Sequence, residues 1–356
     1  MSVTTRPTPP AEVRGVELTG KTLPRLAPLY SGLIAVAAAL LLNVLTSVQG
    51  VAGTAVVAAL LFVAIQSGWS FAVEGKRHAV DRLATTLIYA TFVAAFAALV
   101  AILTVTVAKG VAALSPDFFT ETMRNVSPRR EGGGIAHALV GTLEQVLIAA
   151  AISVPVGIMT AVYLVEYGAG KRLSKSISFF VDVMTGIPSI IAGLFIYTFW
   201  VLTLGFERSG FAASLALTIL MIPTVVRATE EMLRIVPNDL REASLALGIP
   251  KWKTILKIVI PTALGGIITG VMLAVARVAG ETAPLLLTTF LSQNMNWNPF
   301  AGPQASLPTF VWDQIASGTN ASLDRAWAGA LVLILLVMIL YLGARIVARF
   351  FAPKTS

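Results

Sequence analysis

Five ionisable side chains lie within or beside long apolar stretches of this 356-residue sequence: Glu144, Asp182, Arg227, Arg277 and Glu281. A charged group inside a membrane costs roughly 3 kcal/mol or more, so each one is a candidate for a functional role. Arg277 and Glu281 are four residues apart, a spacing that places two side chains on one helix face, where they can pair. A guanidinium binds oxyanions through two parallel hydrogen bonds and keeps its charge. These residues are therefore candidates for a transport pathway, and an ion pair that only fixes helix register is the alternative for Arg277 and Glu281.

The two arginines are expected near opposite sides of the membrane, Arg227 toward the cytoplasmic end of its span and Arg277 toward the outer end. At about 1.5 Å per residue, Arg227 lies ~24 Å along a helix that begins at Phe211, and Arg277 lies ~28 Å along one that begins at Ile258. They are therefore either successive stations on one path or, if the second helix continues to Leu291, parts of one site. Arg227 could instead pair with one of the two glutamates that follow it.

The other acids also have two interpretations each. Glu144 either faces the pathway or pairs with an arginine, or it lies at the outer membrane interface. Asp182 precedes a stretch in which Gly186 and Pro188 weaken the helix, and irregular backbone inside a membrane is tolerated only where it lines a cavity or is buried in protein. The alternative for Asp182 is a helix-capping role in which it pairs with Lys175.

The sequence gives no support for catalysis by this chain alone. It has no cysteine, only two histidines, and neither a zinc-protease nor a serine-hydrolase motif. Gly170 and Lys171 look like the end of a phosphate-binding P-loop, but Val165 and Arg172 stand where that motif needs Gly and Ser or Thr. We therefore expect no enzyme activity, no cofactor, no metal and no ATP site in this chain.

The composition is that of an all-α integral membrane protein. Hydrophobic residues make up 56% of the chain and charged residues 12%, against about 25% in soluble proteins, and the mean hydropathy is +0.82. About 20 apolar residues suffice to cross a bilayer. The sequence predicts eight transmembrane helices, at about 28–47, 54–72, 84–107, 137–165, 178–204, 211–231, 258–280 and 327–350.

The charges predict the orientation of these helices. Cytoplasmic loops carry an excess of Lys and Arg. With both termini in the cytoplasm, 18 of the 26 Lys and Arg residues lie inside and six outside, and two lie within or near spans. The net charge of +8 is explained in this way, without a nucleic-acid partner. No cleaved signal peptide is expected, and residues 1–27 and 351–356 are expected to be cytoplasmic tails, the first of them disordered.

Residues 237–261, a polar and basic segment between two apolar stretches, predict a helix, a glycine turn and a second helix. Pro237 and Asn238 can open the first helix, and Gly248 followed by Pro250 ends it. The residues Glu242-Ala243-Ser244, with Gly248 and Pro250 behind them, resemble the EAA loop of bacterial ABC importer permeases. In that family the loop docks into a groove on the ATPase subunit; a solvated helical loop is the alternative.

Three further phrases narrow this resemblance: GGGIAHALVGTLEQ at 132–145, IPTVVRATEEML at 222–233, and ARVAGETAPLL around Arg277. They resemble the PstA family of phosphate transporter permeases. The resemblance implies a six-helix type I importer core at 84–350, most family-like over 137–350, preceded by an additional hairpin and cytoplasmic loop at 28–83. It also implies that Arg277, Arg227, Glu281 and Glu144 line the substrate pathway.

The same resemblance implies a permease subunit of an ATP-driven inorganic phosphate importer in the bacterial plasma membrane. Its partners would be a PstC-like permease, a dimer of PstB-like ATPases and an extracytoplasmic PstS-like phosphate-binding protein, besides phosphate and membrane lipid. A PstC-like sister subunit, a permease for another oxyanion and a stand-alone secondary transporter are the alternatives. The segment 293–325, with an amphipathic helix expected at Leu307–Gly318, is either the surface for the binding protein or a loop plug.

Overall fold

The computed structural model describes residues 22–45 and 50–351, and every regular element in this part of the chain is a helix. The predicted tails at 1–27 and 351–356 lie mostly outside the described residues. The chain divides into two compact units, 1–103 and 104–356, and the division falls inside one long helix. The predicted boundary between the additional hairpin and the core, at about residue 83, stays a prediction.

The number of apolar helices agrees with the predicted fold class. Among the described residues, seven helices are long and apolar enough to cross a membrane, and a bent pair raises the number to eight. The span predicted over 178–204 is this bent pair, and the weak helix expected around Gly186 and Pro188 is broken there. The chain forms α6 (Arg172–Thr185) and α7 with η2 (Ser189–Thr203), and the two parts are bent by 105°. Gly186 and Pro188, which weaken the helix in sequence, stand at this break.

The first unit is built on an antiparallel pair of helices, α1 (Ala27–Leu45) and α2 (Val51–Glu74), followed by the start of α3 (Lys76–Ala113). Ser31 Oγ donates a 2.7 Å hydrogen bond to Gln66 Oε1 between the first two helices. Glu74, at the end of α2, accepts two 2.7 Å bonds from Arg82 and one from Ser70. Polar side chains are thus paired inside an otherwise apolar hairpin, as burial away from water requires.

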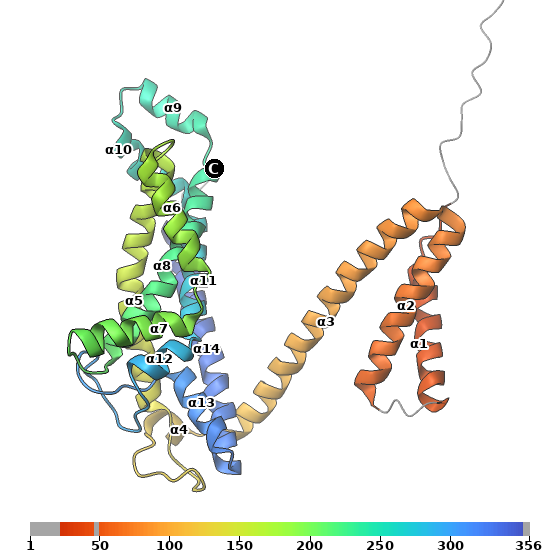
Figure 1. Ribbon diagram of the computed structural model, residues 1–356, viewed down its shortest axis with the longest axis horizontal. Helices are drawn as coiled ribbons and strands as arrows, with labels where there is room; N and C mark the ends of the chain where they lie inside the picture. The colour runs from red at the N-terminus through yellow and green to blue at the C-terminus, as the bar shows by residue number, and fades with distance from the viewer. Residues whose placement is uncertain (1–21, 46–49, 352–356) are drawn as a thin grey trace, which may run out of the picture. The chain divides into compact units, whose positions relative to one another are not determined.

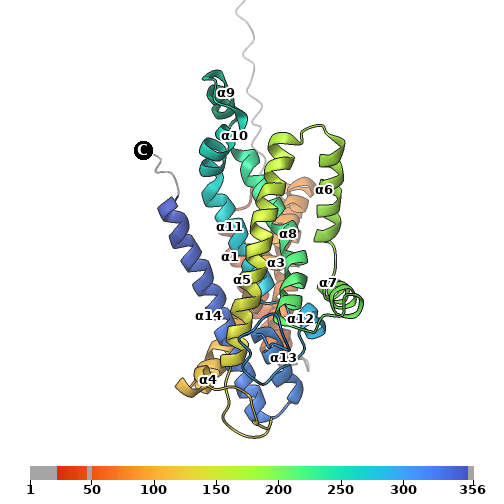
Figure 2. The same cartoon turned by 90° about the vertical axis from the view of Figure 1, so that its left-hand side faces the viewer.

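The second unit contains the remaining helices in chain order (Figure 1). They are α4 (Pro116–Thr120), α5 (Ala136–Val162), η1 (Tyr163–Tyr167), α6, α7 (Ser189–Ile196), η2 (Tyr197–Thr203), α8 (Gly210–Ile235), α9 (Asn238–Ala246), α10 (Lys251–Thr254), η3 (Ile255–Val259), α11 (Ile260–Ala279), α12 (Ala283–Thr288), α13 (Leu307–Ser317) and α14 (Asn320–Phe351). Both views place α9 and α10 at one end of this unit and α4 and α13 at the other (Figure 2).

Helix α8 is the centre of this unit and the most buried of the spans. It packs along α5 and α11, and α6, α7 and α12 also contact it. Small residues allow these close approaches: a Cβ on Gly157 of α5 would lie 2.6 Å from Val225, and one on Gly270 of α11 would lie 2.5 Å from Ala228. Close backbone approach at glycine is the usual way for membrane helices to gain packing contacts.

The helix expected at Leu307–Gly318 is confirmed as α13. Ser306 and Thr309 form a reciprocal capping box at its start, and Gly318 ends it with a left-handed backbone at φ 65°. Its inner face is buried, with Leu307 and Phe310 in an apolar cluster that includes Ile135 and Ala328. The helix therefore packs against α5 and α14 within the unit.

Candidate transport pathway and coupling loop

The predicted helix, turn and helix at 237–261 are confirmed as α9 and α10. Gly248 joins them with φ 78°, a left-handed conformation that glycine adopts without strain. Pro250 precedes α10 as its N-cap residue. Asn238 is not the cap of α9, because Pro237 occupies that position and no side chain caps the helix there.

Residues 237–261, which we call the coupling loop after the EAA loop that they resemble, differ in how exposed their side chains are. Glu242, Ala243 and Gly248 are exposed, so they can meet another protein. Ser244 is buried, and its hydroxyl lies 2.8 Å from the hydroxyl of Thr254 in α10. Ser244 therefore holds the two helices of the loop together.

Arg241 fixes the base of this loop, a role that the sequence patterns did not reveal. Its Nε donates to Glu166 Oε1 at 3.0 Å and its Nη2 lies 2.9 Å from the same oxygen. It also donates to the carbonyls of Leu233 and Val236, at 2.8 and 2.6 Å, in and just after the last turn of α8. The guanidinium thus joins α9 both to the end of α8 and to η1.

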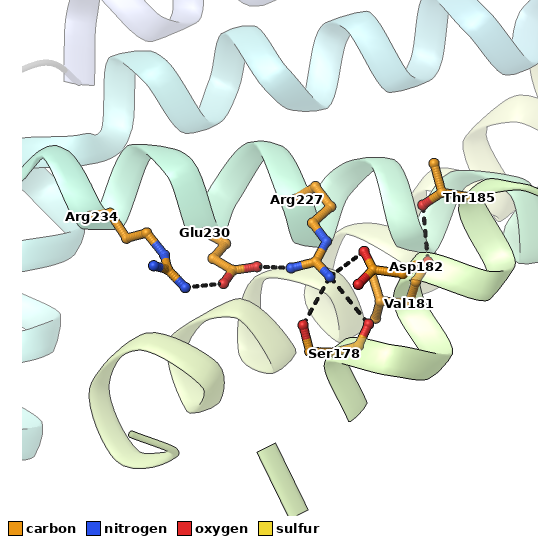
Figure 3. A network of polar contacts seen from close by, with 7 residues as sticks. All are labelled: Ser178, Val181, Asp182, Thr185, Arg227, Glu230 and Arg234. Atoms are coloured by element: carbon orange, nitrogen blue, oxygen red, sulfur yellow. Dashed lines mark hydrogen bonds and ion pairs between the residues drawn. The ribbon is translucent and has the colours of Figure 1, made fainter. Parts of the chain in front are cut away.

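Arg227 lies within a network of acids on α6 and α8 (Figure 3). It donates to Glu230 at 2.5 Å, to the hydroxyl of Ser178 at 2.9 Å, and to Asp182. Glu230 also accepts a 2.6 Å bond from Arg234, so two carboxylates balance two guanidinium groups. The predicted alternative of pairing with a following glutamate is what the structure shows, whereas Asp182 meets Arg227 and not Lys175.

The expected helical pair of Arg277 and Glu281 does not form. Helix α11 ends at Ala279, and Gly280 is its C-cap residue, so Glu281 lies beyond the helix. The chain then turns into the separate helix α12, which excludes a span that continues to Leu291. Arg277 is exposed in the last turn of α11, and no ion pair or side-chain hydrogen bond reaches its guanidinium within the described part of the chain.

Arg277 belongs to one exposed side of α11. The exposed positions recur every three or four residues along this helix, as one face of a helix requires. They are Thr262, Gly265, Thr269, Leu273 and Arg277. Three of these five residues are polar, which is unusual for a surface that faces lipid. This side therefore forms a polar strip from the coupling-loop end of α11 to its last turn.

Glu144 is anchored at the opposite end of the unit. Gln304 Nε2 donates to Glu144 Oε2 at 2.5 Å, and Gln304 Oε1 accepts from Gln145 Nε2 at 3.1 Å. Gln304 lies on the segment between α12 and α13, 160 residues further along the chain. No arginine meets Glu144 in the described residues, and Gln304 was not singled out from the sequence. The hydrogen bond between Glu144 and Gln304 thus connects α5 to the segment between α12 and α13.

The fold of the chain is similar to that of solved ABC transporters. The chain resembles the solved structure of a bacterial alginate ABC transporter with a TM-score of 0.55 and 15% identity, over 79% of this chain and all of that one. It also resembles an inward-facing MetNI methionine ABC transporter with a TM-score of 0.51 and 21% identity, over 67% of this chain and all of that one. The chain therefore shares its fold with a chain of each of these ABC transporters.

The particular family follows from the sequence comparisons. Residues 153–356 match the family of binding-protein-dependent transport system inner membrane components, and the chain belongs to that family. Three relatives named phosphate transport system permease protein are PstA 1 of Mycobacterium tuberculosis H37Rv, PstA of Mycobacterium leprae and PstA of Yersinia pestis. Their identities are 48, 49 and 40%, over 78, 74 and 79% of this chain and 90, 86 and 93% of the relatives.

Proposed function

We propose that this chain is the PstA-type permease subunit of an ATP-driven importer of inorganic phosphate. The observation that carries the proposal is the 40–49% identity to relatives named PstA over about three quarters of the chain. The type I importer fold and the apolar spans agree with it. In this function the chain forms half of a pathway and hydrolyses no ATP itself.

The polar strip of α11 is the part of the chain best suited to line that pathway. Arg277 is the charged group on it that has no acid partner among the described residues, so its fork of donors is available to an oxyanion. Glu281, just beyond the helix, can accept a hydrogen bond from the hydroxyl of monohydrogen phosphate. Glu144 supports the pathway indirectly, because it positions the segment that carries Gln304.

Arg227 would be a second station on the path. Its donors are held by Asp182, Ser178 and Glu230, so phosphate must displace at least one of them. Asp182 is the group most easily displaced, because its side chain is 65% exposed, whereas that of Glu230 is 7% exposed. A movement of α6 away from α8 would release Asp182 and open Arg227 to the substrate.

The coupling loop would dock on the ATPase. Its exposed residues, Glu242, Ala243 and Gly248 with Pro250, form the surface for a PstB-like ATPase dimer, while Ser244 and Arg241 hold the loop to the spans. A PstC-like permease would complete the pore, and a PstS-like protein would deliver phosphate on the other side. This arrangement puts both termini in the cytoplasm of a bacterial cell.

The test of coupling is phosphate uptake and phosphate-stimulated ATP hydrolysis by the reconstituted complex. We expect Glu242→Lys to abolish both and to release the ATPase during purification, because it reverses the charge of an exposed docking residue. Glu231→Lys is the matched control, since Glu231 is an exposed acid on α8 outside the loop. Transport that persists in Glu242→Lys without any ATPase would contradict the ABC importer assignment.

The test of the pathway is Arg277→Gln in the same assay. This change removes the charge and keeps a polar side chain, so the complex should assemble while uptake falls by at least about 100-fold, as expected for the loss of charge-assisted hydrogen bonds to the substrate. Arg277→Lys should give an intermediate rate, because it keeps the charge and loses the bidentate fork. Normal uptake by Arg277→Gln would exclude this residue from the path.

A further inference from the structure

A basic pocket lies beside the base of the coupling loop, apart from the polar strip of α11. Its volume is about 550 Å³, within the roughly 300–1,000 Å³ range of small-molecule sites. It is formed by η1, the glycine-rich turn before α6, the end of α8 and the two helices of the coupling loop. Five cationic side chains line it: Lys171, Lys175, Arg234, Arg241 and Lys251.

The carboxylates nearby do not balance these cations. Glu166 is the acid that lines the pocket, and Arg241 already binds it. Arg234 and Arg227 both form ion pairs with Glu230, and Arg227 also forms an ion pair with Asp182. Counting Arg227 with the five pocket cations gives six positive charges against three carboxylates, a net charge of +3. A concave site of one sign concentrates ions of the opposite sign.

Three of the cations keep donors for a ligand. Lys171 and Lys175 are exposed and meet no carboxylate among the described residues. The ammonium of Lys251 donates to the carbonyl of Glu166 and lies 5.1 Å from the centre of the Tyr167 ring. Because an ammonium has three donors, it retains at least one.

The backbone adds further donors on the same side. The turn Gly168–Lys171 leads into α6, whose first turn has no side-chain cap, so its backbone N–H groups are free to bind an anion. Gly170 takes φ 77°, and a Cβ on Gly168 would lie 2.8 Å from Ser174. Two glycines are therefore needed for the tight turn that brings Lys171 to the rim.

We propose that this pocket binds the phosphate group of an anion that arrives from the coupling-loop side, either free inorganic phosphate or the headgroup of an anionic lipid. Such a ligand bridges the start of α6 with α10, and thereby restrains the coupling loop against the spans. The inference rests on the proposed function in one respect: that function places the coupling loop, and so the mouth of the pocket, on the cytoplasmic side of the membrane.

The experiment uses the whole importer complex, without the binding protein, in nanodiscs of phosphatidylcholine. Equilibrium binding of ³²P-orthophosphate is measured for the wild type and for the double variant Lys171→Ala/Lys175→Ala. The control is Lys253→Ala/Lys257→Ala, which removes the same charge from exposed positions of α10 and η3 outside the pocket. A second arm uses nanodiscs with phosphatidylglycerol and measures lipid retained after detergent extraction by native mass spectrometry.

We expect the pocket variant to raise the phosphate Kd, or to reduce retained phosphatidylglycerol, by at least about tenfold, the loss of one charged hydrogen bond or more. The control should stay within about twofold. An effect in the first arm identifies free phosphate, and an effect confined to the second identifies a lipid headgroup. The proposal is overturned if neither arm depends on the two lysines, or if their loss only weakens ATPase association.

The outcome is separable from that of the transport assay. Arg277→Gln should leave binding in the pocket unchanged, because Arg277 lies in the last turn of α11, away from the pocket. If the complex transports a solute other than phosphate, binding that depends on Lys171 and Lys175 still supports the pocket. If uptake of phosphate is normal and neither arm responds, the function stands and the pocket proposal fails.

Discussion

Replacement of Arg241 by Met tests whether the buried pair with Glu166 holds the coupling loop in place. The side chains of Arg241 and Glu166 are 16% and 6% exposed, so the variant leaves an acid buried without its cation. Removal of one partner from a buried ion pair costs about 3–5 kcal/mol. The carbonyls of Leu233 and Val236 also lose their donor, which puts the expected loss at the upper end of that range.

The assay is thermal unfolding of the detergent-solubilised complex, together with recovery of the ATPase. Arg241→Met should lower the midpoint of unfolding and weaken ATPase recovery. Arg234→Met is the matched control: its side chain is 68% exposed, and the loss of an exposed ion pair costs about 1 kcal/mol at most.

The double variant Arg241→Met/Glu166→Met gives the sharper result. It removes the buried acid along with its partner, so it should be more stable than Arg241→Met alone. A coupling energy of about 2 kcal/mol or more is expected from the double-mutant cycle. If the two single losses simply add, the buried pair does not explain how the loop is held.

Three other changes test features of the second unit, two by the same unfolding assay and one by protease cleavage. Gly141→Ala should cost about 1–3 kcal/mol, because its Cβ would lie 2.0 Å from a backbone carbonyl, whereas Gly343→Ala on α14 meets nothing within 4 Å and should be neutral or stabilising by up to about 1 kcal/mol. Gly248→Ala should cost about 1 kcal/mol through its left-handed backbone, and a stability equal to wild type would contradict the turn geometry. Arg325→Met should speed protease cleavage of the loop at 128–132, because Arg325 holds three of its backbone carbonyls, and unchanged cleavage would refute that role.

Several features were predictable from the sequence because they depend on neighbouring residues. Uninterrupted apolar stretches give seven of the spans, and the pattern of Pro237, Gly248 and Pro250 gives the two helices and the turn at 237–261. The break in the fifth span was only half predicted. Gly186 and Pro188 signal a weak helix, but the 105° bend depends on how α7 packs against α8 and α12.

The partners of the charged residues were not predictable in this way. Arg227 meets Asp182 from 45 positions earlier, Arg241 meets Glu166 from 75 positions earlier, and Glu144 meets Gln304 from 160 positions later. Spacing predicts an ion pair only where one helix continues through both residues, as at Arg227 and Glu230 but not at Arg277 and Glu281, whereas a pair between helices depends on which faces pack together. The sequence by itself determined that this is a polytopic membrane protein with a helix, a glycine turn and a second helix at 237–261. Only the tertiary structure decided which arginines are neutralised and which remain open, because packing of the helices sets these distances.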